Sequence, residues 1–206
     1  MNILAIGAHP DDIEFGCGGS LAYLSSKNHK INLFVLTKGE IGGSGEVRKK
    51  EQENSSKLLN AKIFWSKFSD TKIPFEKDLI DAIESIIKIT KPDLIFSHFP
   101  LDSHQDHQRV GQAVITAARY SRNVLFYEVP TTTGDFTPDI FVNIGKFLEK
   151  KMQLLKAHKS QVYATRVAGL SILETAKACA TFRGFQARVK FAEGFKPLRF
   201  ALENFL

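Results

Sequence analysis

Residues 3–12 read Ile-Leu-Ala-Ile-Gly-Ala-His-Pro-Asp-Asp, an apolar run that ends in one imidazole and two carboxylates. The apolar part is typical of a buried β-strand. Residues 19–26 have apolar side chains at helical spacing and are predicted to form a helix, so the His-Pro-Asp-Asp segment follows a predicted strand and precedes a predicted helix. In an open α/β sheet, ligands bind at this edge, outside the carboxyl ends of the strands.

The alternation of strand and helix patterns continues along the chain. Further strands are expected at residues 31–37, 62–65, 93–97, 124–129 and 139–144, and helices at 48–59, 78–90, 108–119, 145–158 and 168–180. Such an order predicts a parallel sheet wound with helices. We therefore expect a Rossmann-like α/β fold with helices on both faces of the sheet. Because no linker or repeat interrupts the pattern, the fold is expected to be a single domain over residues 1–206.

A second polar segment, residues 97–107, follows another predicted strand and holds three of the six histidines. It reads Ser-His-Phe-Pro-Leu-Asp-Ser-His-Gln-Asp-His. Two histidines and one carboxylate form a known catalytic zinc site with an open fourth position. His9, Asp12 and one histidine of this second segment would supply that set. Spacing alone does not choose between His104 and His107.

Each motif also has a purely structural explanation. Asp11 or Asp12 could cap the helix that follows them. His104 and His107 could be loop histidines, one of them capping the next helix, and Asp106 could itself be that cap. Because both motifs follow predicted strands of one sheet, a shared metal site accounts better for the two together.

The two motifs resemble the signatures of one enzyme family. Residues 8–19, which begin Ala-His-Pro-Asp-Asp, and residues 102–107, Asp-Ser-His-Gln-Asp-His, are similar to the two signatures of the LmbE-like (PIG-L) N-deacetylases. Further residues resemble family positions, namely Arg48, Glu51, Lys151, His158, Ser160, Gln161, Glu193, Gly194 and Phe195. One departure is Leu59-Asn60, where the family carries Leu-Gly. Asparagine tolerates the same left-handed conformation at a helix end.

The resemblance implies a zinc-dependent enzyme that removes acetyl groups from N-acetylglucosamine derivatives. Matched to the family motifs, His9, Asp12 and His107 are the metal ligands. Fe²⁺ or another divalent ion could take the place of Zn²⁺, because nitrogen and oxygen ligands discriminate weakly among these metals. The expected partner is a small amino-sugar conjugate, whose identity no residue specifies.

The remaining motif residues receive roles around this set. Asp11, the carboxylate left without a metal, is expected to be the general base. A cationic His104 is expected to stabilise the oxyanion, and Asp106 to hold a histidine in its tautomer. Arg48 could grip a phosphate or carboxylate of the substrate with two parallel hydrogen bonds, or it could be a solvated charge on its helix. His158 is placed at the rim of the pocket by resemblance only.

Two other functions use the same motifs. A phosphomonoesterase with the same ligands would need several cations converging on the substrate, and only Arg48 is a clear candidate. A nucleotide-binding module is suggested by Gly16, Gly18 and Gly19 after a strand. These glycines do not follow the Gly-x-Gly-x-x-Gly order that such modules use. The glycine-rich residues 39–45 are expected to form a mobile flap over the site, with a plain surface loop as the alternative.

Composition narrows the classes of partner. The formal net charge is +6, but the lysines are scattered without interleaved aromatic residues, so no nucleic-acid surface is expected. No apolar run reaches the roughly 18 residues of a membrane span. Cys17 and Cys179 are too few for a disulfide framework, and Cys17 is expected to be a small buried residue. With no leader pattern, a cytoplasmic location is expected. The sequence leaves homo-oligomerisation open.

Overall fold

A seven-stranded sheet in the order β3-β2-β1-β4-β5-β7-β6 forms the centre of this computed structural model, which describes residues 1–201. The strands are β1 (Asn2–Gly7), β2 (Lys30–Val35), β3 (Lys62–Trp65), β4 (Leu94–His98), β5 (Val124–Tyr127), β6 (Ile140–Asn143) and β7 (Ala192–Arg199). The helices are α1 (Asp12–Ser26), α2 (Gly45–Leu58), α3 (Lys77–Thr90), α4 (Gln105–Ala117), α5 (Leu148–Ala157) and α6 (Ile172–Gln186), with short 3-10 turns η1 (Gly145–Phe147) and η2 (Lys159–Gln161).

The predicted fold class is confirmed, with one strand that differs from the prediction. Strands β1 to β5 pair in parallel. Strand β7 runs antiparallel between β5 and β6, which makes the sheet mixed. No strand was predicted for the segment after the last helix. The prediction failed there because β7 carries Gly194 and Pro197, two residues that are depleted in strands.

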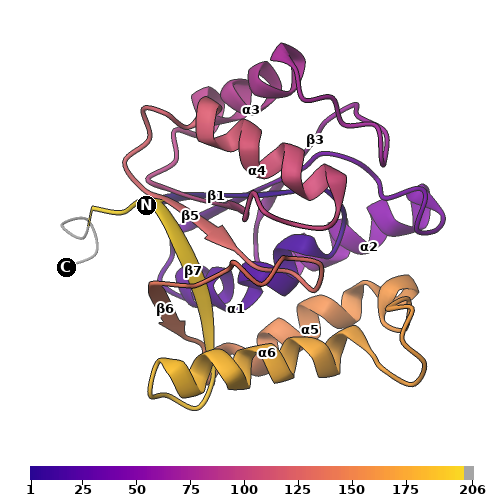
Figure 1. Cartoon of the computed structure of the whole chain (residues 1–206), viewed down its shortest axis with the longest axis vertical. Helices are drawn as coiled ribbons and strands as arrows, with labels where there is room; N and C mark the ends of the chain where they lie inside the picture. The colour runs from indigo at the N-terminus through magenta and orange to yellow at the C-terminus, as the bar shows by residue number, and fades with distance from the viewer. Residues whose placement is uncertain (202–206) are drawn as a thin grey trace.

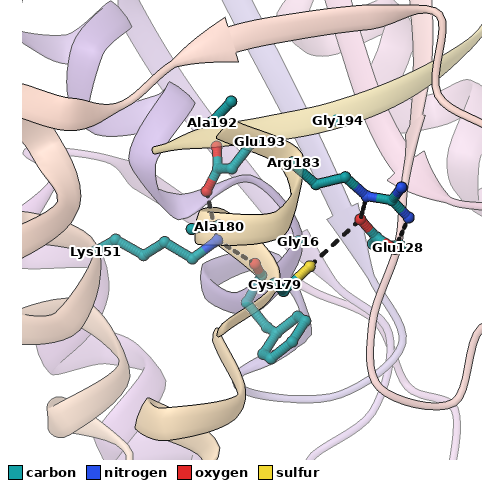
Figure 2. A pocket seen from close by; sticks show the side chains of 10 residues that line it. Gly16, Glu128, Lys151, Cys179, Ala180, Arg183, Ala192, Glu193 and Gly194 are labelled. Carbon is teal, nitrogen blue, oxygen red and sulfur yellow. Dashed lines mark hydrogen bonds and ion pairs between the residues drawn. The ribbon is translucent and has the colours of Figure 1, made fainter. Parts of the chain in front are cut away.

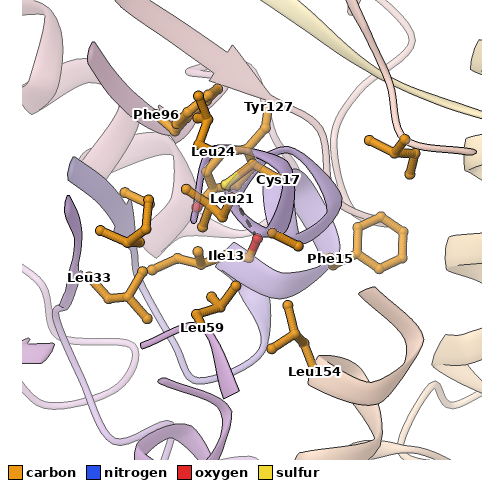
Figure 3. Close-up of a cluster of buried hydrophobic side chains, with 14 of the residues drawn as sticks. Ile13, Phe15, Cys17, Leu21, Leu24, Leu33, Leu59, Phe96, Tyr127 and Leu154 are labelled. Atoms are coloured by element: carbon orange, nitrogen blue, oxygen red, sulfur yellow. Dashed lines mark hydrogen bonds between the residues drawn. The ribbon is translucent and has the colours of Figure 1, made fainter. Parts of the chain in front are cut away.

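The apolar run that begins the chain is buried on both faces of the sheet. Ile3 and Ala5 belong to one hydrophobic cluster, and Leu4 and Ile6 belong to the other. Helices α1, α5 and α6 cover the first face, and α3 and α4 cover the second (Figure 1). Figure 3 shows the first cluster, built around side chains of α1. Burial on both faces explains why β1 is apolar without alternation.

Helix α1 begins earlier than predicted. It starts at Asp12, so Gly16 and Gly18, which were expected to precede the helix, lie inside it together with Gly19. A Cβ atom at Gly16 would come within 2.1 Å of the Tyr127 ring, and one at Gly19 within 2.9 Å of Ile144. The glycines therefore let α1 pack closely against β5 and the chain before η1. This packing role removes the basis for a phosphate-binding glycine loop at this position.

Replacing Gly16 with alanine should destabilise the fold by about 1–3 kcal/mol, because the added methyl group overlaps a fully buried aromatic ring. Urea unfolding at constant m-value would measure this change. Gly134→Ala is the matched control, since its Cβ would meet nothing within 4 Å, and it should change the free energy of unfolding by less than about 0.5 kcal/mol. Equal effects of the two substitutions would contradict the packing argument.

Most of the other helix boundaries differ from the predicted ones by a few residues. The helix predicted at 145–158 is η1 followed by α5, and the one predicted at 168–180 is α6. Asn60, just after α2, has a φ of 53°, the left-handed conformation that the sequence predicted. Residues 202–206 lie outside the described chain. No helix within residues 1–201 is long and apolar enough to cross a bilayer.

The topology brings the two polar motifs together. Strand β1 lies between β2 and β4, and the chain leaves β1 towards β2 but later returns on the other side of β1 as β4. The carboxyl ends of β1 and β4 therefore form the topological switch point, where ligands bind in such sheets. His9 follows β1 by two residues, and His98 is the last residue of β4.

Candidate functional site

A cavity at this switch point is lined by residues of both motifs. The lining residues are His9, Asp11, Asp12, Ile41, Gly42, Arg48, Asp70, Thr71, His104, His107, Val129, Pro130, Thr131, Gln161, Ala164, Thr165 and Arg166. Six of the seven predicted site residues are in this set. The seventh, Asp106, is fully buried behind it.

Three side-chain atoms from the two motifs form a small triangle. His9 Nδ1 lies 3.3 Å from Asp12 Oδ2 and 3.2 Å from His107 Nε2, and the third edge, from His107 Nε2 to Asp12 Oδ2, is 3.4 Å. Bonds of about 2.0–2.2 Å to a tetrahedral zinc ion place its ligand atoms about 3.3–3.6 Å apart. These residues could therefore hold one such ion.

The outer nitrogen of each triangle histidine contacts a carboxylate. His9 Nε2 is 3.0 Å from Asp70 Oδ1 and 3.2 Å from Asp106 Oδ2. His107 Nδ1 is 3.3 Å from Asp102 Oδ1. Metal-binding histidines typically donate their other N–H in this way, which fixes the tautomer and the orientation of the ring.

The charges of the cluster favour a bound cation. Four carboxylates surround the two imidazoles. Burial alone would lower the pKa of His9, yet the contacts with Asp106 and other carboxylates raise it well above the ordinary value. Burial is likewise outweighed at His107, where Asp12 and Asp102 raise the pKa to about 9. The pocket therefore stabilises positive charge at the positions of both rings.

Besides the triangle, three overlapping His and Asp groups in the described chain have ligand atoms close enough to share an ion. They are His9 with His104 and His107, Asp12 with His98 and His107, and His9 with Asp70 and Asp106. His98 is poorly placed to be a metal ligand. Its Nε2 already accepts the Ala8 N–H at 3.1 Å, and the side chain is fully buried. Burial and the neighbouring His107 lower the pKa of His98 to about 4.

His104 begins helix α4. Its Nδ1 accepts the Asp106 N–H at 3.2 Å, so it is the N-cap of the helix. The proton of the neutral ring is therefore on Nε2. Burial and the neighbouring His107 lower the pKa of His104. The expected cationic His104 is thus disfavoured, because burial and the positive charge on the neighbouring His107 both oppose protonation of this ring. The neutral ring can donate a hydrogen bond from Nε2.

Neither aspartate of the first motif caps α1 with its side chain, so that structural alternative is wrong. Asp11 occupies the N-cap position with a φ of 92° and makes no side-chain cap hydrogen bond. Asp12 Oδ2 instead accepts the His9 N–H at 2.8 Å. Burial, opposed by the Arg48 guanidinium, raises the pKa of Asp11 to about 6.

Arg48 lies in the cavity wall, but other groups already engage its guanidinium. Nη1 donates to Gly39 O at 2.6 Å, and Nη2 donates to Pro10 O at 2.9 Å and lies 3.5 Å from Asp11 Oδ2. The side chain is buried. Arg48 thus ties the glycine-rich segment to the first motif. Its predicted grip on a substrate anion stays a prediction, as does the mobility of residues 39–45.

Asp106 faces the first motif and does not cap α4. Besides its contact with His9, Oδ2 accepts the Thr71 N–H at 2.7 Å. The N-cap alternative for Asp106 is wrong, because that position belongs to His104.

Sequence reasoning missed two carboxylates of the site. Asp70 lines the cavity and also accepts the Ile41 N–H at 3.0 Å, which attaches the glycine-rich segment. Asp70 follows β3, whose carboxyl end lies at the same edge of the sheet, and this position could have indicated that Asp70 belongs to the site. Asp102 lay within the quoted second motif but received no role. It also accepts the His104 N–H at 2.8 Å and thereby orders the start of α4.

His158 lies beneath the cavity, so the prediction that placed it at the rim is wrong. Its side chain is almost fully buried, and its Nε2 is 3.5 Å from Glu14 Oε1. Glu14 Oε1 also accepts from Gln52 Nε2 at 2.6 Å and from Ser55 Oγ at 2.8 Å. Gln52 in turn accepts the Asp11 N–H at 3.3 Å. This buried group supports the turn that carries Asp11.

The later residues that resemble family positions join distant parts of the chain. Lys151 Nζ lies 2.6 Å from Glu193 Oε1, and both side chains are buried (Figure 2). Glu193 also accepts the backbone N–H groups of Gly19 and Ser20, so it ties β7 to α1. Glu51 accepts from Ser160 N and Oγ in the same manner. Cys17 is fully buried among apolar side chains, as predicted.

Comparison with known proteins identifies the family that this fold and site define. The family model described as PIG-L, GlcNAc-PI de-N-acetylase, matches residues 4–118, which include both motifs. The chain belongs to this PIG-L family of de-N-acetylases.

Relatives and solved structures agree with this assignment. The uncharacterized deacetylase YaiS of Escherichia coli is 40% identical over 167 residues, covering 77% of this chain and 90% of that protein. A probable N-acetyl-α-D-glucosaminyl L-malate deacetylase of Bacillus cereus is 27% identical, covering 79% and 84%. The structure of N,N′-diacetylchitobiose deacetylase from Pyrococcus horikoshii superposes with a TM-score of 0.84 at 25% identity, covering 95% of this chain and 83% of that one.

Proposed function

We propose that this protein is a metal-dependent N-deacetylase that hydrolyses the acetamide of an N-acetylglucosamine-type conjugate to a free amine and acetate. The observation that carries the proposal is the triangle of His9, Asp12 and His107, with Asp11 beside it and all four residues lining one cavity. Family membership supports the reaction class.

In this proposal His9 Nδ1, Asp12 Oδ2 and His107 Nε2 hold the ion. Zn²⁺ is the first choice because two histidines and one carboxylate suit it, although Fe²⁺ has similar preferences. A divalent ion bound there would polarise the amide carbonyl and make a water molecule more acidic. Asp70, Asp102 and Asp106 keep the two imidazoles oriented, because they contact the outer ring nitrogens.

Asp11 is the proposed general base. Its carboxylate is beside the triangle without forming part of it, and a pKa of about 6 suits a group that must both accept and return a proton near neutral pH. It takes one proton from the attacking water molecule. When the carbon–nitrogen bond breaks, it delivers that proton to the departing amine nitrogen, so its own charge is restored.

His104 is the proposed oxyanion donor. Its Nδ1 is occupied by the Asp106 N–H, so Nε2–H is the group left to donate to the amide oxygen as negative charge develops there. A neutral N–H donor suffices for this role, and removing one such donor typically costs about 3–4 kcal/mol of transition-state stabilisation.

The substrate class follows from the relatives. Proteins similar to this chain are named for diacetylchitobiose and for N-acetyl-α-D-glucosaminyl L-malate. We therefore propose a small conjugate of an N-acetylated amino sugar as the substrate. A cytoplasmic location is proposed with it, because Cys17 and Cys179 are both free thiols.

A substrate panel tests the proposal. Purified protein is incubated with N-acetylglucosamine glycosides and with phosphate monoesters, before and after a chelator and again after added Zn²⁺. We expect acetate release from the glycosides, loss of that activity with the chelator and its return with Zn²⁺. Phosphate release without acetate release would favour the phosphomonoesterase, and acetate release that resists chelation would refute the metal-dependent mechanism.

A further inference from the structure

The lining of the cavity contains two arginines with very different surroundings. Arg48 is buried, and its guanidinium donates to the backbone carbonyls of Gly39 and Pro10. Arg166 is exposed at the mouth of the cavity and, within residues 1–201, makes no hydrogen bond or ion pair. Arg166 therefore presents the free guanidinium of this cavity.

The loop that carries Arg166 is closed on itself. The Ile172 N–H donates to Val162 O at 2.9 Å, and Thr165 Oγ1 donates to Leu170 O at 2.8 Å. Arg166 itself has a φ of 59°, a conformation that is uncommon for residues other than glycine and that needs support from its surroundings. The backbone therefore holds the arginine in a set position.

The same loop faces the glycine-rich segment across the cavity mouth. Gln161 Nε2 donates to Gly42 O at 3.4 Å, which joins the two walls. The floor below carries the carboxylates of Asp11, Asp12 and Asp70. Negative charge is thus concentrated at the floor, around the proposed metal ligands, and positive charge stands at the rim. A substrate that fits this pattern carries its anionic group away from the acetamide.

We propose that Arg166 forms an anion-binding subsite at the mouth of the cavity, which selects amino-sugar conjugates with a carboxylate or phosphate on the part remote from the acetamide. The inference rests on the proposed deacetylase function and adds the charge of the substrate to it. An exposed guanidinium recognises both anions through paired, charge-assisted hydrogen bonds. The role of gripping an anion, which the sequence analysis gave to Arg48, belongs in this proposal to Arg166.

Selectivity between matched substrates tests the subsite. The panel is a neutral N-acetylglucosamine methyl glycoside, the corresponding glycoside of a hydroxy acid, and N-acetylglucosamine 1-phosphate, assayed for acetate release by the metal-loaded enzyme. For the wild type, kcat/KM of one or both anionic substrates should exceed that of the neutral glycoside about tenfold. Raising the salt concentration should reduce this ratio.

Substitutions assign the preference to one side chain. Arg166→Gln should lower the anionic-to-neutral ratio about tenfold, mainly through KM, and Arg166→Glu should lower it further. Arg188→Gln is the matched control, because Arg188 is also an exposed arginine with left-handed backbone, at φ 58°, but lies over the Phe185 ring outside the cavity lining. It removes the same net charge and should keep the wild-type ratio.

The outcomes separate the subsite from the reaction. Equal kcat/KM for neutral and anionic glycosides, or a proportional loss on all substrates in Arg166→Gln, overturns the subsite while the deacetylase stands. A fall of the ratio in Arg188→Gln equal to that in Arg166→Gln also overturns it, since net charge would then be the cause. Absence of acetate release from every substrate refutes the proposed function itself. A larger effect on the hydroxy-acid glycoside or on the phosphate identifies which anion the subsite takes.

Discussion

His107→Ala should purify with almost no divalent metal, where the wild type holds about one ion per chain, and its deacetylase activity should fall by at least about a thousandfold. The reason is geometric: His107 Nε2 supplies one corner of the triangle with His9 and Asp12. Elemental analysis after gel filtration measures the metal. Stoichiometric metal in the variant would remove His107 from the proposed ligand set.

His104→Asn is the matched control for that experiment. Asparagine can still cap α4, so the helix start should remain, and metal should stay bound. Activity should nevertheless fall by about 10²–10³-fold, because the proposed oxyanion donor is lost. Asp106→Asn should give an intermediate result, about 10- to 100-fold weaker metal binding, since Asp106 contacts the outer nitrogen of His9. If His104→Asn released the metal and His107→Ala did not, the two assignments would be reversed.

Asp11→Asn should keep the metal and the fold but lose about 10²–10⁴-fold in kcat, the usual contribution of a general base. Asparagine preserves the shape of the side chain and tolerates the φ of 92° at this position. Single-turnover acetate release and elemental analysis, made on the same sample, separate loss of chemistry from loss of metal. Full turnover in the variant would exclude Asp11 as the base.

The pH profile adds a second readout for Asp11. A base works when it is deprotonated, so activity falls as the pH drops through its pKa. Burial, opposed by Arg48, raises the pKa of Asp11 to about 6, and a bound cation would lower it from there. The acid limb of kcat/KM for the wild type should therefore lie at or below about pH 6, and the residual activity of Asp11→Asn should lack it.

Local patterns predicted most of the sheet and the place of the site. The apolar run before His9 and the run before His98 are β1 and β4, and they lie side by side. Because parallel strands present their carboxyl ends at one edge, two motifs about a hundred residues apart could be expected to meet there. The structure brings His9, Asp12 and His107 within 3.4 Å of one another, and their roles remain predictions.

Features set by distant contacts were not predictable in this way. Gly16 was expected to precede a helix and suggested a nucleotide-binding module, yet it lies inside α1, where the absence of a side chain leaves room for the Tyr127 ring. Strand β7 depends on partners in β5 and β6 that precede it by dozens of residues. Asp70 lacks any local motif, and its contact with His9 depends on the path of the chain after β3. The sequence also does not show which arginine is available to a substrate. Arg48 is already hydrogen-bonded to two backbone carbonyls, which leaves Arg166 as the candidate in the cavity lining.

The adjacency of β1 and β4 also has a consequence for biosynthesis. His9 and Asp12 leave the ribosome early, but their partner His107 is synthesised 98 residues after His9. A nascent chain that ends before α4 lacks one corner of the triangle, and β1 has no β4 beside it until the intervening units have formed. The ion should therefore bind late in folding, after the long-range strand pairs have formed. Its binding would then raise the free energy of unfolding of the assembled sheet.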